Sequence, residues 1–564
     1  MSGLRNLVCC LAAIALTAVT IDHGFAQSSD DLKNDEKTPS DVLVYGMGYS
    51  GRRFSSLVQI NRDNAEKLVP VWAYSMADNQ GAEGFPIVAD GVIYATSHNA
   101  TVAVDALTGR QRWRISHDYS AETLRVVCCG VVNRGAAIFN GKIIRTTLDN
   151  HVLALDAKTG KEIWNTTSPD PASIKNGYSM TGAPLVANGV VVVGVAGADF
   201  SHRGFIEGYD AETGKHLWRL YTVPAKGEPG SETWERDSAP TGGSTWVTGS
   251  YDPELDLVYW GTGNPAPWNP RGRKGDNLFT DSIIALRPRT GERVWFYQAM
   301  PNDPYDFDAV QTPIIAALHG DRSERKVIMQ ANRNGILYVL DAGTGKLLTA
   351  NPFEKINWTN GINLETGRPN YTEVFSSSVE GKKVTVWPSV TGATNWQHAS
   401  FNLQTGLLYI NALHVGMTYE APEPRDPVLG ESVSGTIKRT TVIDDPNIRG
   451  FLKAVDPMTG KSKWERPYKS PNFSSILTTA GHLVFTGTMT GEFQALDSDT
   501  GKLLWSFQTP SGIVGQPVTW ERNGKQYITV MSGIGGVYAT RSGDPNLASV
   551  PIGASLWTFA LFDK

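Results

Sequence analysis

The sequence predicts an all-β fold, an eight-bladed β-propeller with tryptophan-docking repeats, on three observations. A short phrase recurs in which an apolar residue, usually followed by Asp, precedes Thr-Gly, often with a Trp four residues later. Strand-like apolar runs such as GVIYAT, HVLALD and HLVFTG flank the copies. The ordinary spacing between copies, about 40 to 55 residues, suits a four-stranded blade with its loops.

Seven copies of the phrase are clear, and two weaker ones extend the series. The clear copies are VDALTGRQRW (Val104 to Trp113), LDAKTGKEIW (Leu155 to Trp164), YDAETGKHLW (Tyr209 to Trp218), LRPRTGERVW (Leu286 to Trp295), LDAGTGK (Leu340 to Lys346), VDPMTGKSKW (Val455 to Trp464) and LDSDTGKLLW (Leu496 to Trp505). The weaker ones are NLQTGLLY (Asn402 to Tyr409) and an opening segment that ends at Trp72.

The phrase has a direct physical meaning. Asp and Thr side chains bond the local backbone and Gly accepts a conformation that other residues resist, so Asp-x-x-Thr-Gly is a turn signal. Each unit is therefore expected to be a strand, a tight turn and a second strand ending in Trp. The nine signals predict eight blades, because the first and last segments are expected to share one. The longer gaps at 211–286 and 346–455 are expected to contain insertions that cover one face of the propeller.

Length and charge limit the function. The chain has 564 residues, 41% of them hydrophobic, which is enough to bury a large core. A repeat architecture of this length grows as one body rather than as several domains. The formal net charge is −5 and no long basic run occurs, so a nucleic-acid partner has no electrostatic support.

The N-terminus predicts export. Arg5 provides a positive start, residues 7–20 are apolar, and Gly24-Phe25-Ala26 is a plausible cleavage site before Gln27. Residues 1–26 are therefore interpreted as a signal peptide and 27–564 as a single propeller domain. The alternative is a membrane anchor, but the apolar run is short for a span and no later segment could cross a bilayer. We expect a periplasmic protein.

Two cysteines remain for the exported chain. Of the four, Cys9 and Cys10 lie in the signal, which leaves the neighbours Cys128 and Cys129 in a compartment where disulfides persist. The sequence contains no CxxCH motif, so no c-type haem is expected on this chain.

Several further motifs agree in content and order with one family. They are VVCCGVVNRG (126–135), GVAGADFSHRG (194–204), GGSTWVTGSYDP (242–253), GTGNPAPWN (261–269) and PNDPYDFDAV (301–310). From about residue 40 to the C-terminus the chain resembles the methanol and ethanol dehydrogenases that depend on the quinone cofactor PQQ.

The resemblance implies a set of PQQ contacts. Cys128 and Cys129 would form a ring disulfide that packs on one face of the quinone, where the alternative is two buried thiols. Trp246 would stack on the other face, with Ser244 as a hydroxyl donor, and Arg134 would meet a PQQ carboxylate. The other matching positions are Glu83 (GAEGFPIVADG), Thr181 (YSMTGAP), Gly197, Ala198, Arg333 (NRNG), Asn395 and Trp396 (GATNWQ).

The resemblance also implies a metal site and a base. The ligands would be Asp199, where the family usually carries Glu, with Asn264, Asp306 and Asp308. Ligands that offer only oxygen suit calcium or a lanthanide and argue against zinc or copper. Asp306 would accept the alcohol proton while hydride passes from carbon to the quinone carbonyl that the cation polarises. Arg333 would stabilise charge on the quinone oxygens.

Four departures from the family pattern bear on substrate and metal. Phe473 and Val537 stand where bulky Trp residues are usual, Ala196 where Ser is common, and Asp199 is one methylene short. Loss of two indoles predicts a substrate larger than methanol, such as a secondary or ring alcohol.

Asp308 favours a lanthanide, with calcium as the alternative. It lies two residues after Asp306, so an extended segment would present both side chains on one face. In the family, lanthanide enzymes place Asp there and calcium enzymes a small uncharged residue. With Asp199, the three carboxylates would match a trivalent ion and overcharge a divalent one. The opposing possibilities are that Asp199 fails to close the site or that Asp308 points to solvent.

Electrons would pass to an external acceptor, since no haem is expected on the chain, and the resemblance implies a soluble cytochrome c. Two rival functions stay open at this point. One is a non-catalytic propeller scaffold of the outer-membrane assembly type, which has no use for the cysteine pair or the oxygen ligands. The other is a quinoprotein acting on sugars or aldehydes, which is expected to lack CCGVVNRG.

Overall fold

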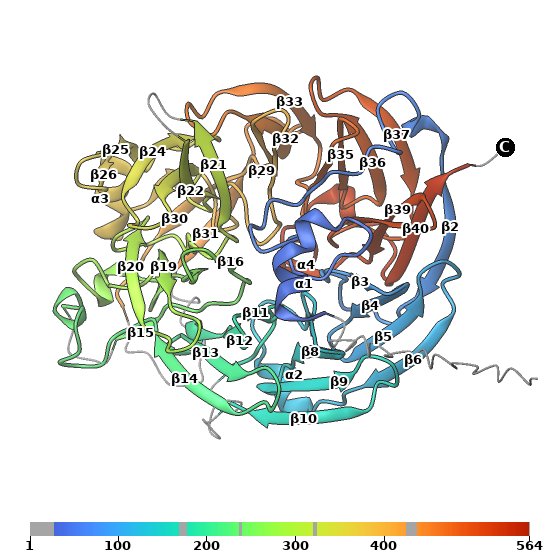
Figure 1. Cartoon of the computed structure of the whole chain (residues 1–564). Helices are drawn as coiled ribbons and strands as arrows, with labels where there is room; N and C mark the ends of the chain where they lie inside the picture. Colours follow the sequence, from blue (N-terminus) through green and yellow to red (C-terminus); the bar gives the residue numbers. More distant parts are fainter. Residues whose placement is uncertain (1–26, 169–176, 236–239, 320–323, 425–436, 563–564) are drawn as a thin grey trace, which may run out of the picture.

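The computed structural model describes residues 27–168, 177–235, 240–319, 324–424 and 437–562. The predicted signal peptide, with Cys9 and Cys10, lies outside these residues. Figure 1 shows sheets that follow one another round a ring as the chain proceeds from its N-terminus to its C-terminus. The predicted all-β propeller is confirmed by this arrangement.

Eight sheets formed by the described residues have four or more strands, and their neighbouring strands are antiparallel apart from one added edge strand. In chain order they contain β3 (Ile87–Ala89), β4 (Val92–Thr96), β5 (Ala100–Asp105) and β6 (Gln111–Ser116); β7 (Ala137–Phe139), β8 (Lys142–Thr146), β9 (His151–Asp156) and β10 (Glu162–Thr167); β11 (Leu185–Ala187), β12 (Val190–Gly194), β13 (Phe205–Asp210) and β14 (His216–Tyr221); β16 (Ser250–Asp252), β17 (Leu257–Gly261), β19 (Ser282–Leu286) and β20 (Arg293–Gln298); β21 (Ile314–His319), β22 (Glu324–Ala331), β23 (Ile336–Asp341) and β24 (Leu347–Pro352); β28 (Ser400–Asn402), β29 (Leu407–Leu413), β32 (Gly450–Val455) and β33 (Ser462–Tyr468); β34 (Leu477–Thr479), β35 (Leu483–Gly487), β36 (Glu492–Asp497) and β37 (Leu503–Gln508); and β38 (Val518–Arg522), β39 (Lys525–Ser532), β40 (Ser555–Leu561) and β2 (Leu68–Ser75).

The ring is closed by the two ends of the chain. Strand β2 pairs antiparallel with β40, and in Figure 1 these strands lie together although one is blue and the other red. The prediction that the first and last segments share a blade is therefore confirmed. The edge strand β1 (Phe54–Ser55) adds in parallel to β34 in the preceding sheet.

The repeat turns that begin with Asp have the geometry that their sequence predicts. In the first copy the Asp105 carboxylate accepts bonds from the Thr108 amide at 3.1 Å and hydroxyl at 2.9 Å. Gly109 has a left-handed φ of +68°. Asp156 and Thr159 repeat the pattern at 2.8 and 2.7 Å. The turn joins the third and fourth strands in seven of the eight sheets, all except the one that β2 closes, and its glycine leaves a flat outer surface.

A tryptophan from one sheet covers the glycine turn of the next. A Cβ on Gly160 would come within 2.9 Å of the Trp113 ring, and the indole N–H donates to the Ala157 carbonyl of that turn at 3.0 Å. The other indoles that donate to a carbonyl of the following sheet are Trp72 (to Ala106), Trp218 (to Pro288), Trp295 (to Ala342), Trp464 (to Ser498) and Trp505 (to Leu68).

Two details of the repeat prediction are wrong. The Trp does not end its strand but lies inside it, as Trp113 lies within β6, because its ring must reach the neighbouring turn while the strand continues. NLQTGLLY forms the β28–β29 hairpin between the first two strands of a sheet, so Gly406 faces open space rather than an indole. The outer turn of that same sheet is the one in VDPMTGKSKW.

The copy without Trp has a substitute. Thr349 stands at the tryptophan position of LDAGTGK, and Asn351 instead covers Gly460 of the next sheet. The Asn351 amide donates to the Met458 carbonyl at 3.1 Å, which resembles the bond that the indoles make elsewhere.

The two long gaps contain additional elements, as predicted. They include β15 (Thr241–Gly242) with β18 (Pro265–Ala266), β25 (Thr359–Ile362) with β26 (Pro369–Tyr371), and a three-stranded sheet of β27 (Val384–Val386), β30 (Gly416–Glu420) and β31 (Lys438–Val442). The α-helices are α1 (Ser29–Asn34), α2 (Ala121–Val126), α3 (Glu373–Val379) and α4 (Gly536–Arg541), and the described part of the chain contains no helix long and apolar enough to span a membrane.

We predict that Gly291→Ala destabilises the protein more than Gly406→Ala. Both glycines are left-handed, with φ of +71° and +67°, so each variant should lose about 1 to 2 kcal/mol from backbone strain. Only Gly291 lies under an indole, since its Cβ would meet the Trp218 ring at 2.5 Å, which should add about 1 to 3 kcal/mol. Denaturant unfolding midpoints would measure the difference, and equal losses would contradict tryptophan docking as the cause.

Candidate active site

The expected site residues come from one face of the propeller. In an antiparallel hairpin the start of the first strand and the end of the second lie at the same edge. Arg134, Trp246 and Asp306 precede first strands, whereas Asp199 and Asn264 follow second strands. The order and direction of the strands therefore bring residues from distant segments of the chain to the same face.

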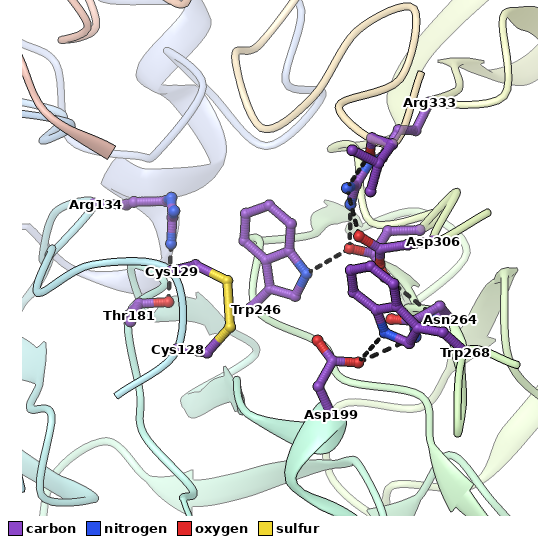
Figure 2. Close-up of a disulfide and its surroundings, with 12 residues drawn as sticks. Cys128, Cys129, Arg134, Thr181, Asp199, Trp246, Asn264, Trp268, Asp306 and Arg333 are labelled. Atoms are coloured by element: carbon purple, nitrogen blue, oxygen red, sulfur yellow. Dashed lines mark hydrogen bonds and ion pairs between the residues drawn. A yellow bond between two sulfur atoms is a disulfide. The ribbon is translucent and has the colours of Figure 1, made fainter. Parts of the chain in front are cut away.

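Cys128 and Cys129 form a disulfide, as predicted. The pair follows helix α2, and Cys129 has a left-handed φ of +70°. In Figure 2 the disulfide lies in the same part of the site as the Trp246 indole, with Arg134 and Thr181 on its other side.

Arg134 is held by a buried set of contacts. It donates to the Thr181 hydroxyl at 2.8 Å and pairs with the Glu83 carboxylate at 2.7 Å. Its guanidinium carbon lies 4.8 Å from the Trp246 ring centre and 5.5 Å from that of Trp396, in cation–π range. Burial raises the pKa of Glu83, and the Arg134 charge opposes that rise. Four of the predicted cofactor contacts are thus joined round one arginine.

The remaining predicted cofactor contacts shape the backbone of the site. Asn395 bonds locally, since its amide donates to the Thr391 carbonyl at 2.9 Å and its oxygen accepts the Trp396 amide at 3.0 Å. Ser244 is buried, and its hydroxyl would lie 2.7 Å from a Cβ on Gly263, so the chain needs glycine there.

Gly197 and Ala198 bring Asp199 into position. Gly197 has a left-handed φ of +92° and precedes the short helix η3 (Ala198–Phe200), in which Ala198 is buried. A side chain at Gly197 would also collide with the Gly177 carbonyl. Glycine is therefore required before the Asp199 turn on both conformational and steric grounds.

Asp199 is fixed by two donors. Its Oδ1 accepts the Asn264 side-chain amide at 3.1 Å and the Trp268 indole N–H at 2.8 Å, as Figure 2 shows. Burial raises the pKa of Asp199, the Trp268 bond opposes the shift, and the negative charge of Asp308 adds to it.

Asp308 is buried and does not point to solvent. One oxygen accepts the Asn264 backbone amide at 2.8 Å. The other accepts the Trp246 indole at 3.1 Å and the Arg333 guanidinium at 2.6 Å. Asp308 therefore connects the expected stacking residue of the cofactor to the expected metal ligands.

Asp306 meets the same arginine by a different geometry from the one predicted. Its φ is +66°, so the segment is not extended at this residue. The Asp303 carboxylate accepts the amides of Tyr305 at 2.8 Å and Phe307 at 2.6 Å, which holds the turn. The Asp306 carboxylate accepts Arg333 at 2.9 Å. The two carboxylates converge because a tight turn and a shared arginine bring them together, not because of strand alternation.

The protonation of Asp306 depends on its surroundings. Burial raises the pKa of its carboxyl, Arg333 opposes the rise, and the nearby carboxylates of Asp308, Asp199 and Asp303 raise it further. Burial also raises the pKa of Asp303 to about 6, against the two amide bonds that favour its ionised form. A positive charge beside Asp306 would return it to the carboxylate state that a base needs.

The donor set fits a hard cation. Among the described residues no three His, Cys, Asp or Glu side chains already converge as a metal cluster, because Arg333 lies between Asp306 and Asp308. Asp306 and Asp308, both buried, share Arg333, and partly buried Asp199 adds a third carboxylate, so the site has an excess of negative charge. The three carboxylates and the side-chain carbonyl of Asn264 would offer a bound ion only oxygen ligands.

Sequence reasoning missed two residues of the site. Trp268 lies within the quoted motif GTGNPAPWN, four residues after Asn264, and could have been noticed as a donor for a neighbouring carboxylate. Asp303 lies within PNDPYDFDAV, three residues before Asp306, where an Asp followed by two backbone amides is a turn signal.

We predict that the Cys128–Cys129 disulfide is present in the purified protein. Intact mass should rise by two hydrogens on reduction, and neither thiol should react with an alkylating agent before reduction. A Cys129→Ser variant is the control, because it should show no such mass change. Free alkylation of both thiols without reductant would contradict the bond.

The comparisons with known proteins agree with this site. The model of the glucose/ethanol/alcohol dehydrogenase β-propeller domain, named for PQQ, matches residues 43–359 and 446–528. The chain is 40% identical to the quinohemoprotein alcohol dehydrogenase ADH IIB of Pseudomonas putida, over 99% of this chain and 82% of that one. It is 37% identical to the quinoprotein alcohol dehydrogenase PedH of Pseudomonas putida, over 95% and 93%.

Solved structures give the same result. The quinohemoprotein alcohol dehydrogenase ADHIIG of Pseudomonas putida aligns with a TM-score of 0.89 at 38% identity, over 96% of this chain and 84% of that one. A europium-containing methanol dehydrogenase aligns with a TM-score of 0.87 at 33% identity, over 94% and 100%. The chain therefore belongs to the family of PQQ-dependent β-propeller alcohol dehydrogenases, which are oxidoreductases.

Proposed function

We propose that this protein oxidises an alcohol larger than methanol to an aldehyde or ketone, with PQQ as acceptor and one metal ion beside it. The observation that carries the proposal is the acidic group of partly buried Asp199 and buried Asp306 and Asp308, beside Trp246 and the vicinal disulfide. A bound PQQ would supply a two-electron acceptor, and a cation would supply Lewis acidity. A scaffold has no need of these carboxylates, and the two relatives named above are alcohol dehydrogenases.

The chain's own residues would bind and orient the cofactor. The disulfide and Trp246 offer two flat surfaces, and Arg134 offers a planar cation held by Glu83 and Thr181. Ser244, Gly197, Ala198, Asn395 and Trp396 complete the proposed contacts. Arg333 would face the reacting end, since it already contacts Asp306 and Asp308.

Asp306 is proposed as the general base. Alcohol oxidation removes a proton from the hydroxyl and a hydride from carbon, and a carboxylate held in place can take the proton. Among the described residues Asp306 has one hydrogen-bond donor, Arg333, whereas Asp308 has three and Asp199 has two, so Asp306 is the carboxylate most available to a substrate hydroxyl.

We predict that Asp306→Asn lowers turnover by about 100-fold or more, which is the ordinary contribution of a general base. The amide keeps one oxygen for the metal and for Arg333, so PQQ should still bind, as its near-ultraviolet absorbance would report. Asp445→Asn, on a surface loop, is the control and should behave as the wild type. Turnover of Asp306→Asn within about tenfold of the wild type would exclude this role.

A lanthanide is proposed over calcium as the metal. Asp199, Asp306 and Asp308 together carry three negative charges when ionised, which a trivalent ion would balance better than a divalent one. Burial strengthens the argument, because an unpaired charge is costly away from water. One structural neighbour is itself a europium-containing methanol dehydrogenase.

We predict that metal-free protein with PQQ regains activity with lanthanum and much less with calcium. Asp308→Ala should abolish the lanthanum response selectively. Asp308→Asn is the matched control for packing, since its oxygen can still accept the Asn264 amide, and it should also lose lanthanum affinity because the charge is gone. Full activity with calcium and none with lanthanum would overturn the proposal.

The substrate is proposed to be a secondary or ring alcohol. Phe473 packs 6.4 Å from the Trp396 ring and 5.2 Å from the Tyr538 ring, and the half-buried Val537 precedes Tyr538 on α4. Two smaller side chains therefore stand where indoles are common, which favours a substrate with more apolar surface than methanol.

We predict that protein reconstituted with PQQ and a cation oxidises secondary and cyclic alcohols with a higher kcat/KM than methanol. An artificial electron acceptor would report turnover across a panel of primary, secondary and cyclic alcohols, with protein lacking PQQ as the control. The highest kcat/KM for methanol would contradict the proposed substrate, and no oxidation of any alcohol would contradict the proposed function.

The electron acceptor is proposed to be a separate soluble cytochrome c, in the periplasm. This proposal rests on the 564-residue sequence, which contains no CxxCH motif and whose first 26 residues have the pattern of a cleaved signal.

A further inference from the structure

Arg439 lies beside the candidate active site without being part of the chemistry described so far. It belongs to β31, the outermost strand of the inserted sheet, and is exposed. Its guanidinium carbon lies 4.7 Å from the ring centre of Trp268. The N–H of the same indole donates to Asp199 at 2.8 Å. Trp268 therefore has Asp199 at its nitrogen and Arg439 over its face.

The electrostatic neighbours of Arg439 indicate how close it is to the reacting groups. Partial burial lowers its pKa, and the positive charges of Arg333 and Arg541 lower it further, while the carboxylates of Asp306 and Asp199 oppose the shift. The charges that act on Arg439 thus include both the proposed base and a second arginine, Arg541. Arg541 ends α4, which also carries Tyr538 against Phe473.

Neither arginine is neutralised within the described part of the chain. No described carboxylate forms an ion pair with the Arg439 or Arg541 guanidinium, and both residues are exposed. Asp306 is already paired with Arg333, and Asp199 is already held by Trp268 and Asn264. Two exposed cations that repel each other would both be stabilised by an anion bound between them.

We propose that Arg439, assisted by Arg541, binds a carboxylate on the alcohol substrate, so that the preferred substrates are hydroxy acids. The inference rests on the proposed function and adds a substrate class to it. The neutral hydroxyl would enter toward Asp306, since a buried acidic group repels an anion, and the carboxylate would stay at the exposed arginines. The intervening Trp268 ring would contact an apolar or aromatic spacer.

The test compares two alcohols of nearly the same shape, 4-(hydroxymethyl)benzoate and 4-(hydroxymethyl)benzamide. The full-length enzyme with PQQ and metal should oxidise the acid with a kcat/KM at least about tenfold higher than the amide, the ordinary worth of one charge-assisted bond. Arg439→Gln should remove most of this preference. Arg439→Lys keeps the charge and should retain part of it, which controls for a packing role of the side chain.

Arg293→Gln is the matched control variant, because Arg293 also stacks on an aromatic ring, that of Phe279 at 3.3 Å, but on the outer strand β20. It should leave the ratio between acid and amide unchanged. Benzoate, which has no hydroxyl to oxidise, should inhibit oxidation of the amide competitively, with a Ki that rises about tenfold in Arg439→Gln.

The outcomes separate this inference from the proposed function. Oxidation of the amide with no preference for the acid, or the same preference in Arg439→Gln as in the wild type, overturns the inference and leaves the alcohol dehydrogenase proposal standing. Failure to oxidise either compound and every alcohol of the panel overturns both. The inference is supported if the preference for the acid is lost in Arg439→Gln and kept in Arg293→Gln. It is also supported if the ratio of kcat/KM for the acid to that for the amide falls as ionic strength rises.

Discussion

The stacking of an outer-strand tryptophan on the glycine turn of the next sheet is the interaction on which the structure depends. Glycine lets the indole lie flat on the turn, and the indole N–H satisfies a carbonyl of the same turn. The Trp505 indole donates to the Leu68 carbonyl of β2, and β2 pairs with β40. Contacts from the outer-strand tryptophans therefore continue into the sheet that closes the ring. Loops on one face are then held at fixed separations although they are far apart in sequence.

That frame permits a buried acidic group that a looser fold could not keep. Carboxylates away from water need donors or counter-ions, and here the donors are rigidly placed. Asp308 receives an amide, an indole and a guanidinium, whereas Arg333 is the one donor to Asp306 in the part of the chain that the structure describes. The carboxylate with the fewest partners is the one whose protonation responds most to what binds beside it, which is the property required of a base.

The sequence predicted the frame well because its signals are local. Asp105, Thr108 and Gly109 specify a turn through their own backbone, and the copies repeat. Contacts between neighbouring sheets were harder to predict, because they join residues that are far apart in the sequence. Nothing local indicates that Asn351 replaces a tryptophan over Gly460, or that NLQTGLLY forms an inner hairpin.

The site shows the same limit on prediction. The motifs identified residues that come together in the structure, including the disulfide. The expectation that Asp306 and Asp308 share a face of an extended segment is wrong. Asp306 has a left-handed φ and lies in a turn that Asp303 holds, so strand alternation does not apply to it. Arg439 had no motif at all. Its place beside Trp268 depends on the pairing of β30 and β31 within an insertion. The groups proposed for chemistry thus stand on loops of the repeated sheets, where spacing is fixed, whereas those proposed for substrate recognition stand on β31 and α4, which the repeat does not constrain. Substrate preference can therefore change through these elements without disturbing the acidic group beneath them.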